Sequence, residues 1–156
     1  VNSKQIGESE YIIAPDEESL KSYLWDRLTE KPGAVILPEW LSVKSWSSIF
    51  SGALVDHHPK SILTQKRIYI DILSGEYPVL FGTRRTLTKR LGHYPDIYLV
   101  YDTMSSEIIF GQRSMPLWMM AQMLEAHGHV IHYITTTPSI RILCDFLQNK
   151  KPIHYL

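Results

Sequence analysis

Six short, continuous apolar runs most strongly constrain how this chain can fold. Each run has the length of a β-strand, and together they occupy residues 11–13, 34–37, 53–55, 79–81, 97–101 and 130–134. Because the runs are continuous rather than alternating, they are typical of strands that are buried on both faces. The sequence therefore predicts a central sheet that is covered on both sides.

Segments with helical spacing lie between the apolar runs. Asp16, Ser61 and Ser139 are placed to cap three helices, and Pro116 lies near the first turn of a fourth, over residues 115–126. The helix after Ser61 carries its apolar and amide side chains at helical spacing, namely Ile62, Gln65, Ile68, Tyr69 and Ile72. Strands that alternate with helices predict right-handed β-α-β units and a mostly parallel sheet.

The composition fits one domain with a sizeable core, since 44% of the 156 residues are hydrophobic. We assign residues 11–148 to this α/β domain, 1–10 to an arm and 149–156 to a C-terminal tail. Sixteen Lys and Arg residues balance sixteen Asp and Glu residues, so binding to a polyanion has to come from a local patch.

Cys144 is the only cysteine, which excludes a disulfide framework within these residues. No apolar stretch has the roughly 18–20 residues of a membrane span. These features favour a cytoplasmic protein without membrane contact.

Ligands of open α/β sheets bind beyond the carboxyl ends of the strands, so the residues that follow each apolar run are the candidates for a site. Residues 74–85, Ser-Gly-Glu-Tyr-Pro-Val-Leu-Phe-Gly-Thr-Arg-Arg, resemble the Gly-Thr-Arg segment of the primosomal protein N-prime (PriA-type) DNA helicases of superfamily 2. Residues 97–102 lie where that family carries its Walker B strand, which puts Asp102 in the acidic motif. Residues 113–139 match its helix, strand and Ser-Ala-Thr-Pro-Ser motif, with Thr136 and Thr137 inside the motif. Pro38-Glu39 is similar to motif Ia.

The resemblance covers residues 11–148 and implies a three-layer RecA-like domain that corresponds to the N-terminal helicase lobe. The ATPase motifs of that lobe are degenerate here. No glycine is followed by lysine, as a P-loop requires, and residues 14–19 place three carboxylates where a phosphate would sit. Thr103 replaces the glutamate that follows the aspartate of the second motif. We therefore expect no ATPase activity, no catalytic residue and no cofactor.

The resemblance also implies a track for single-stranded DNA along the Gly-Thr-Arg segment and motif Ia. The expected phosphate contacts are the hydroxyl and basic side chains of Thr83, Arg84, Arg85, Lys89 and Arg90. Trp40 is a candidate for base stacking. The expected function is non-catalytic: binding single-stranded or forked DNA and organising replication or repair proteins in replication restart, beside a second helicase-like lobe if the chain is part of a longer protein.

Other interpretations of the same residues remain open. The basic cluster also fits a solvated surface helix. A protein-interaction module without direct nucleic-acid binding would use the Met-rich helix over 115–126 and the hydrophobic tail over 152–156. The third interpretation is a hydrolytic enzyme that uses Asp102 with His57 or His58. The spacing of the residues predicts no complete set of nucleophile, base and orienting group for such an enzyme.

The remaining histidine, sulfur-containing and tryptophan residues have simpler interpretations. His127, His129 and His132 should diverge, because Gly128 ends a helix between the first two and His132 lies within a strand, so no metal site is expected. Asp56 with His57 reads as a general-base pair or as a plain turn. Core packing is expected for Cys144 and favoured for the methionines 115, 119, 120 and 123. The tryptophans 25, 46 and 118 are expected to face the core or a partner, and this is also the alternative to base stacking for Trp40.

Overall fold

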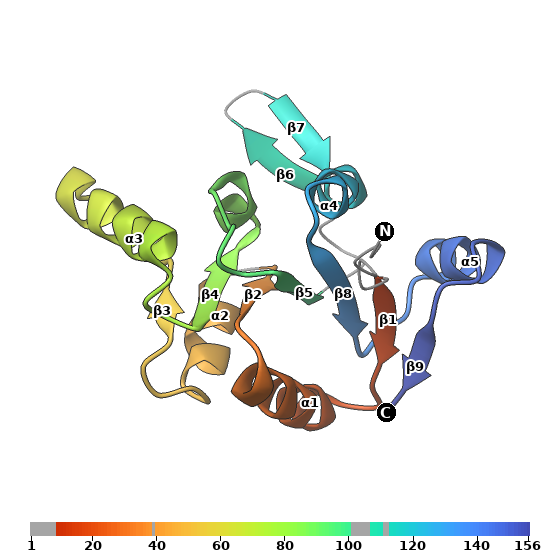
Figure 1. Ribbon diagram of the computed structural model, residues 1–156. Helices are drawn as coiled ribbons and strands as arrows, with labels where there is room; N and C mark the ends of the chain where they lie inside the picture. The colour runs from red at the N-terminus through yellow and green to blue at the C-terminus, as the bar shows by residue number, and fades with distance from the viewer. Residues whose placement is uncertain (1–8, 39, 101–106, 111–112) are drawn as a thin grey trace, which may run out of the picture.

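A seven-stranded sheet, parallel throughout, forms the centre of the computed structural model, which describes residues 9–38, 40–100, 107–110 and 113–156. The strand order is β3-β4-β2-β5-β8-β1-β9 (Figure 1). The strands are β1 (Glu10–Ile13), β2 (Gly33–Leu37), β3 (Leu54–Val55), β4 (Val79–Thr83), β5 (Asp96–Val100), β8 (Val130–Thr135) and β9 (Ile153–Tyr155). The six strands expected from the apolar runs and their parallel pairing are confirmed.

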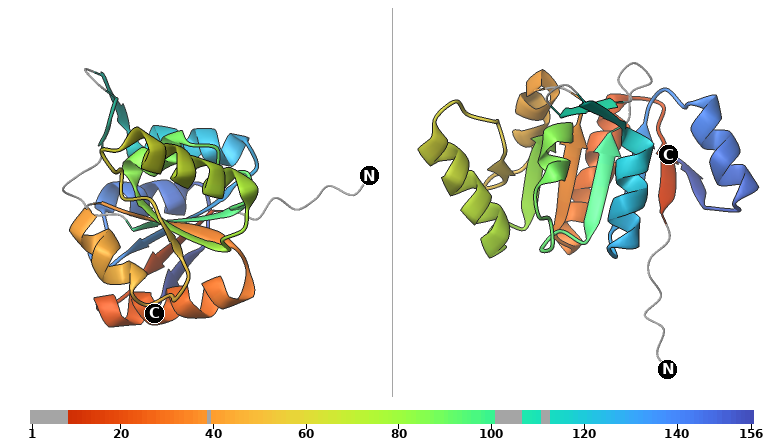
Figure 2. Two further views of the ribbon diagram at one scale, coloured as in Figure 1. Left: turned by 90° about the vertical axis from the view of Figure 1, so that its left-hand side faces the viewer. Right: turned by 90° about the horizontal axis from the view of Figure 1, so that it is seen from above.

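Helices cover both faces of this sheet (Figure 2). One face carries α1 (Glu17–Glu30) and α2 (Trp40–Ser47). The other carries α3 (Ile62–Ser74), the 3-10 helix η1 (Arg84–Thr88), α4 (Leu117–Ala126) and α5 (Ile140–Gln148). Neighbouring strand residues point to opposite faces, so Ala34 and Ile36 belong to one core cluster whereas Val35 and Leu37 belong to the other. The chain thus has a three-layer α/β fold of the RecA-like or Rossmann type.

The helix ends follow the local signals in the sequence. The Asp16 carboxylate accepts a hydrogen bond from the Ser19 backbone N–H at 2.8 Å and caps α1. Ser61 caps α3, and Gly75, with φ of +70°, ends it in the left-handed conformation. Pro116 precedes α4 as its N-cap residue, so this helix begins at Leu117, two residues later than the expected start.

Four elements were not expected from the sequence. They are α2, the antiparallel hairpin of β6 (Glu107–Phe110) and β7 (Arg113–Pro116), and β9. β9 lies in the segment assigned to a tail, yet it pairs with β1, and the Leu156 N–H donates to the Ile13 carbonyl at 2.9 Å. Ser9 and Glu10, assigned to an arm, are buried at the start of β1. The sheet therefore extends beyond residues 11–148 at both ends.

Some side chains expected in the core lie at the surface. Cys144 is exposed, as are Met119 and Met123, whereas Met120 is buried. Trp46 is buried, as expected. Trp25 is half exposed and stacks on Phe50, with ring centroids 4.8 Å apart. Among the helices of the described ranges, none combines the length and the apolar character that a membrane span requires.

Candidate nucleic-acid interface

The strand order divides the carboxyl edge of the sheet into two halves. β1, β8 and β5 are neighbours, and Ile13 at the end of β1 is paired with Thr135 at the end of β8. β2, β4 and β3 form the other half. The segments that resemble nucleotide-binding motifs therefore follow adjacent strands of the first half, which we call the nucleotide-like half. The segments that resemble a DNA track follow strands of the second half, which we call the DNA-like half. Asp102 and Glu39 lie outside the described residues.

The first segment of the nucleotide-like half has no room for a phosphate-binding loop. Only three residues separate Ile13, the last residue of β1, from Glu17, the first of α1. A helix N-terminus attracts anions, but here the Asp16 carboxylate already accepts from the Ser19 N–H. Hydrogen bonding to the side chain of Ser19 and to its backbone N–H lowers the pKa of Asp16 below its ordinary value, so the group remains charged. Glu17 and Glu18 add negative charge in the first turn, so a triphosphate would be repelled.

The second segment of this half is a turn over residues 135–137 that is closed by hydrogen bonds between Thr135 and Thr137. The Thr135 hydroxyl accepts from the Thr137 N–H at 3.0 Å and lies 3.1 Å from the Thr137 carbonyl, to which it donates. Thr135 is buried, whereas Thr136 and Thr137 are exposed. The hydroxyl that holds this turn is thus one residue earlier than the two that the resemblance singled out.

On the other half, η1 folds directly back onto the end of β4. Gly82 makes this possible, because a Cβ atom at this position would lie 2.2 Å from the Thr86 Oγ1 atom. The glycine of the Gly-Thr-Arg segment is therefore a packing requirement. It places Arg85 and Lys89 beside α3.

Asp56, which follows β3, is the buried group that holds this arrangement together. Its carboxylate accepts from the Thr86 hydroxyl at 2.8 Å and from the Lys89 ammonium at 2.5 Å. Burial raises the pKa of Asp56, but the hydrogen bonds from Lys89 and Thr86 and the charge of His58 outweigh it, so the pKa lies below its ordinary value. Asp56 is fully buried and serves as an anchor for η1. His57, its proposed partner as a general base, is exposed, and its Nδ1 atom lies 3.4 Å from the Val55 carbonyl.

His58 connects the same anchor to Thr83. Its Nε2 atom lies 2.8 Å from the Thr83 Oγ1 atom, and its Nδ1 atom lies 3.6 Å from the Asp56 carboxylate. Burial lowers the pKa of His58 below its ordinary value, against the raising effect of Asp56, and the charges of Lys89, Arg85 and His57 lower it further. The ring is therefore neutral at neutral pH and engages the hydroxyl of Thr83.

The expected phosphate contacts separate into surface and buried side chains. Arg85 and Arg90 are exposed, and about a fifth of the Lys89 side chain is exposed. Arg84 was also expected to contact phosphates, but it is only 7% exposed because η1 turns it into the fold. Trp40 begins α2 on the opposite face of the sheet, and its side chain lies outside the described part of the chain.

A groove of about 700 Å³ runs between η1 and α3, and we name it the α3–η1 groove. Its lining residues are His58, Pro59, Ile62, Gln65, Lys66, Tyr69, Ile70, Arg85, Thr88 and Lys89. Three of these side chains are cationic and none is a carboxylate. Lys66 and Arg85 form no ion pair with any described carboxylate. The groove is thus a local positive site in a chain whose net charge is zero.

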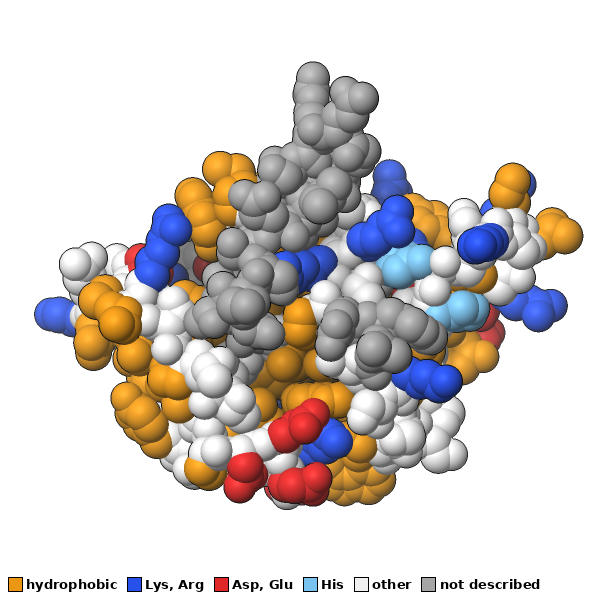
Figure 3. Space-filling view, turned by 180° about the vertical axis from the view of Figure 1, so that it is seen from behind, with side chains coloured by type: hydrophobic (Ala, Val, Ile, Leu, Met, Phe, Trp, Pro, Cys, Tyr) orange, Lys and Arg blue, Asp and Glu red, His pale blue; other side chains and the backbone are white. Residues whose placement is uncertain are grey.

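The charged side chains at the surface follow the same division into two halves of the carboxyl edge (Figure 3). Seen from behind, basic and histidine side chains gather on the α3 side of the molecule, whereas acidic side chains gather over the start of α1. An anionic ligand would therefore be attracted to the DNA-like half of the edge and repelled from the nucleotide-like half.

Sequence reasoning did not identify the α3 wall of this groove. Ile68 and Ile72 are buried against the sheet, but Ile62, Lys66 and Tyr69 face the groove instead of the core. The spacing of positions 62, 66, 69 and 70 is that of one helix face, so the signal was present in the sequence. What the sequence did not show is that η1 lies opposite this face.

The histidines do not form a metal site within the described ranges, where no group of three suitable ligands is close enough to hold an ion. His132 instead lies between Glu10 and Asp96, at 2.6 and 2.8 Å. This cluster is at the amino edge of the sheet, away from the groove.

No protein-family model matches the chain, and no curated protein matches its sequence significantly.

Proposed function

We propose that this chain is a non-catalytic, helicase-like domain of the cytoplasm that binds the phosphate backbone of single-stranded or forked DNA through the α3–η1 groove. In this proposal it acts in replication restart or repair, and resembles the N-terminal lobe of the PriA-type helicases. The observation that carries the proposal is a groove with three cationic side chains and no carboxylate among its lining residues.

The position of the groove supports this function independently of its charge. It lies beyond the carboxyl ends of β3 and β4, and ligands of open α/β sheets bind at that edge. The groove also includes Arg85, which belongs to the segment that resembles the Gly-Thr-Arg motif. Arg85 and Lys66, which form no ion pair with a described carboxylate, are the proposed phosphate contacts, whereas the Lys89 ammonium is paired with Asp56.

The acidic start of α1 supports the absence of ATP hydrolysis from the proposed function. A motor of this class needs phosphate groups at the end of β1, where Asp16 occupies the helix N-terminus. One lobe by itself also cannot translocate on DNA, so the proposed role is to hold the strand and to organise partners. The proposed partners are replication or repair proteins and, if the chain is part of a longer protein, a second helicase-like lobe.

Fluorescence anisotropy with labelled single-stranded and forked DNA at several salt concentrations tests the proposal. Binding should weaken steeply with salt, and Lys66→Ala/Arg85→Ala should reduce the log–log slope by about 1.4, since each phosphate contact on a single strand contributes about 0.7. The charge-matched control is Lys31→Ala/Arg67→Ala, which removes two cations outside the groove. A folded chain that shows no binding at low salt would refute the proposal.

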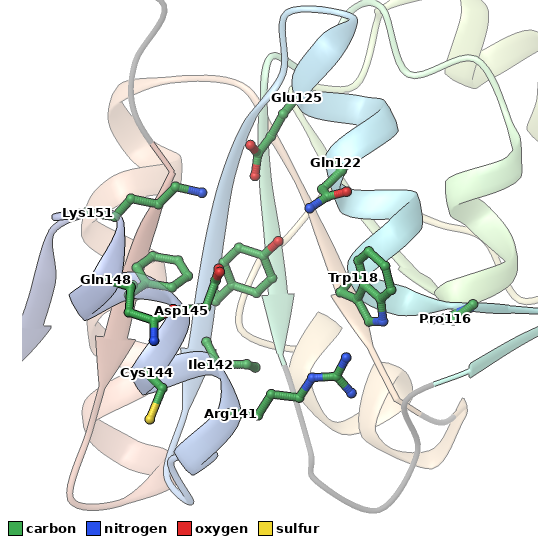
Figure 4. A pocket seen from close by; sticks show the side chains of 12 residues that line it. Pro116, Trp118, Gln122, Glu125, Arg141, Ile142, Cys144, Asp145, Gln148 and Lys151 are labelled. Carbon is green, nitrogen blue, oxygen red and sulfur yellow. The ribbon is translucent and has the colours of Figure 1, made fainter.

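A second candidate function, a protein-interaction module without nucleic-acid binding, is favoured by the surface of α4. Trp118, Met119 and Met123 are each between 40% and 49% exposed on this helix. Beside it, a pocket of about 510 Å³ separates α4 from α5, and Gln122 and Glu125 point into it across from Lys151 (Figure 4). Flexible methionine side chains suit surfaces that adapt to a partner.

A photo-crosslinking residue at Met123 tests the second candidate against purified replication and repair proteins. Adducts that disappear in the Met119→Glu variant, from a chain that does not bind DNA, would favour this function over the first. Adduct formation that is unchanged by Met119→Glu would argue against it.

A further inference from the structure

The α3–η1 groove has two chemically different walls. The η1 wall carries Arg85 and Lys89. The α3 wall carries Ile62, Tyr69 and Ile70, with Lys66 between them. The η1 wall is therefore polar, whereas the α3 wall combines apolar and aromatic surface with one cation.

The apolar side chains of the α3 wall are accessible to a ligand. Ile62 is 67% exposed, Ile70 is 62% exposed and Tyr69 is 37% exposed. The core contacts of α3 come from Ile68 and Ile72, so these three side chains do not hold the helix to the sheet. A ligand that covered only the cationic wall would leave them in water.

A nucleotide has the matching division, with a phosphate on one side and a planar base on the other. In a duplex the base faces are stacked and their edges are paired, so they cannot lie against a protein wall unless the duplex opens. In a single strand the bases are free to stack on an aromatic ring or an aliphatic surface while the phosphates remain on basic side chains. The groove volume of about 700 Å³ is within the range of ligand sites that enclose such groups.

We propose that the α3 wall binds the bases, with Tyr69 as the stacking platform, so that the groove takes unpaired nucleotides and discriminates against duplex. This inference rests on the proposed function, because it assumes that phosphates lie between η1 and Lys66. It adds the element that recognises the base side of the strand and names Tyr69, Ile62 and Ile70 as its surface.

Three probes of equal length separate the contribution of bases from that of phosphates. They are a twelve-nucleotide oligothymidylate, a twelve-unit abasic deoxyribose-phosphate strand, and a blunt duplex of the oligothymidylate, each within the usual range of site sizes. We expect the full chain to bind the oligothymidylate at least about 5-fold more tightly than the abasic strand, and up to about 150-fold more tightly for one stacked base. The duplex should bind no more tightly than the abasic strand.

Variants of α3 assign this difference to the groove wall. Tyr69→Ala should lower the affinity for oligothymidylate to that for the abasic strand without changing the salt slope. Tyr69→Phe should retain the higher affinity for oligothymidylate. Leu73→Ala is the matched control, since Leu73 is 41% exposed on the same helix but does not line the groove. Circular dichroism of each variant checks that α3 is intact, and Ile62→Ala provides a second test of the wall.

Equal binding of the oligothymidylate and the abasic strand, or a Tyr69→Ala variant that behaves like Leu73→Ala, would overturn this inference and leave the phosphate groove standing. Duplex that binds as tightly as the single strand would also overturn it. If none of the three probes binds at low salt, the proposed function fails and this inference fails with it.

Discussion

His132 shows how single residues fix the amino edge of the sheet. Its ring lies between the carboxylates of Glu10 and Asp96 and stacks on Tyr98, with centroids 4.5 Å apart. Burial lowers the pKa of His132, but the hydrogen bonds and charges of Asp96 and Glu10 outweigh it and raise the pKa above its ordinary value. Burial raises the pKa of Glu10, but hydrogen bonds from His132 and Tyr23 and the charges of His132 and Arg27 lower it to about 2. His154 adds a further contact to Glu10 at 3.3 Å.

These two shifts predict that the contribution of this cluster to stability is greatest between pH 4.5 and 6.5, the ordinary pKa values of Glu10 and His132. The contribution of His132 is fully present below 6.5 and is lost as the pH rises through its raised folded-state pKa. The contribution of Glu10 is present above 4.5 and is lost as the pH falls towards 2. Urea unfolding between pH 4 and pH 9 measures this profile.

His132→Gln should lower the free energy of unfolding by about 3–5 kcal/mol, because it removes the imidazole that pairs with both carboxylates and leaves Glu10 with Arg27 and His154 as its partners. It should also remove the loss of stability on the alkaline side. His127→Gln, at an exposed position, is the control. A variant that keeps the alkaline loss would show that another group is responsible.

His58 predicts a second pH effect, on binding. The pKa of His58 lies below 6.5, so lowering the pH below this value adds a positive charge beside Arg85 and Lys89. Affinity for single-stranded DNA should therefore rise as the pH falls. The rise in affinity should be smaller in the His58→Gln variant. It should be unchanged in the His57→Gln variant, because His57 does not line the groove. Anisotropy titrations from pH 5 to 8 compare these two variants with the unmodified chain.

At the scale of elements, the packing of η1 on β4 depends on Gly82. A methyl group there would collide with the Thr86 side chain, which also holds Asp56. Gly82→Ala should lower stability by about 1–3 kcal/mol through overpacking and should weaken DNA binding by displacing Arg85. At Gly92 an added Cβ atom meets nothing within 4 Å, so Gly92→Ala is the control. Thermal unfolding and DNA titration of both variants measure the two effects, and equal behaviour would contradict the packing argument.

The sequence was informative about elements with a strong local pattern. The long helices have caps such as Asp16 and Ser61, and the buried strands have continuous apolar runs, so both were predicted. β9 was missed because its three residues, after Pro152, form a strand only by pairing with β1. The burial of Arg84 and the α3 wall were missed for a related reason, since they depend on contacts between segments distant in sequence. Local pattern therefore determined the fold class and the basic segment, but not which of its side chains reach the surface.

For the whole molecule, the division of charge between the two halves of the carboxyl edge predicts that no nucleotide binds at the start of α1. A ligand that binds only the folded chain raises its melting temperature in proportion to the logarithm of its concentration. With Asp16 at the start of α1 and two glutamates beside it, we expect millimolar magnesium-ATP to leave the melting temperature of the Lys66→Ala/Arg85→Ala variant, which lacks the free cations of the α3–η1 groove, unchanged. An increase in a thermal-shift measurement would mean that phosphate is bound despite these carboxylates.

The place of β1 within the sheet has a consequence for how the chain is made. Its two neighbours are β8 and β9, and Glu10 is 122 residues away from its partner His132. On a ribosome the first strand of this domain therefore leaves the exit tunnel well before either neighbour has been synthesised. Until then its buried edge groups lack backbone partners, and such long-range pairing is slow and prone to aggregation. β2, β3, β4 and β5 can pair among themselves earlier, but β1 lacks both of its neighbours until residues 130–155 emerge, so this side of the sheet is completed by its latest-made strands.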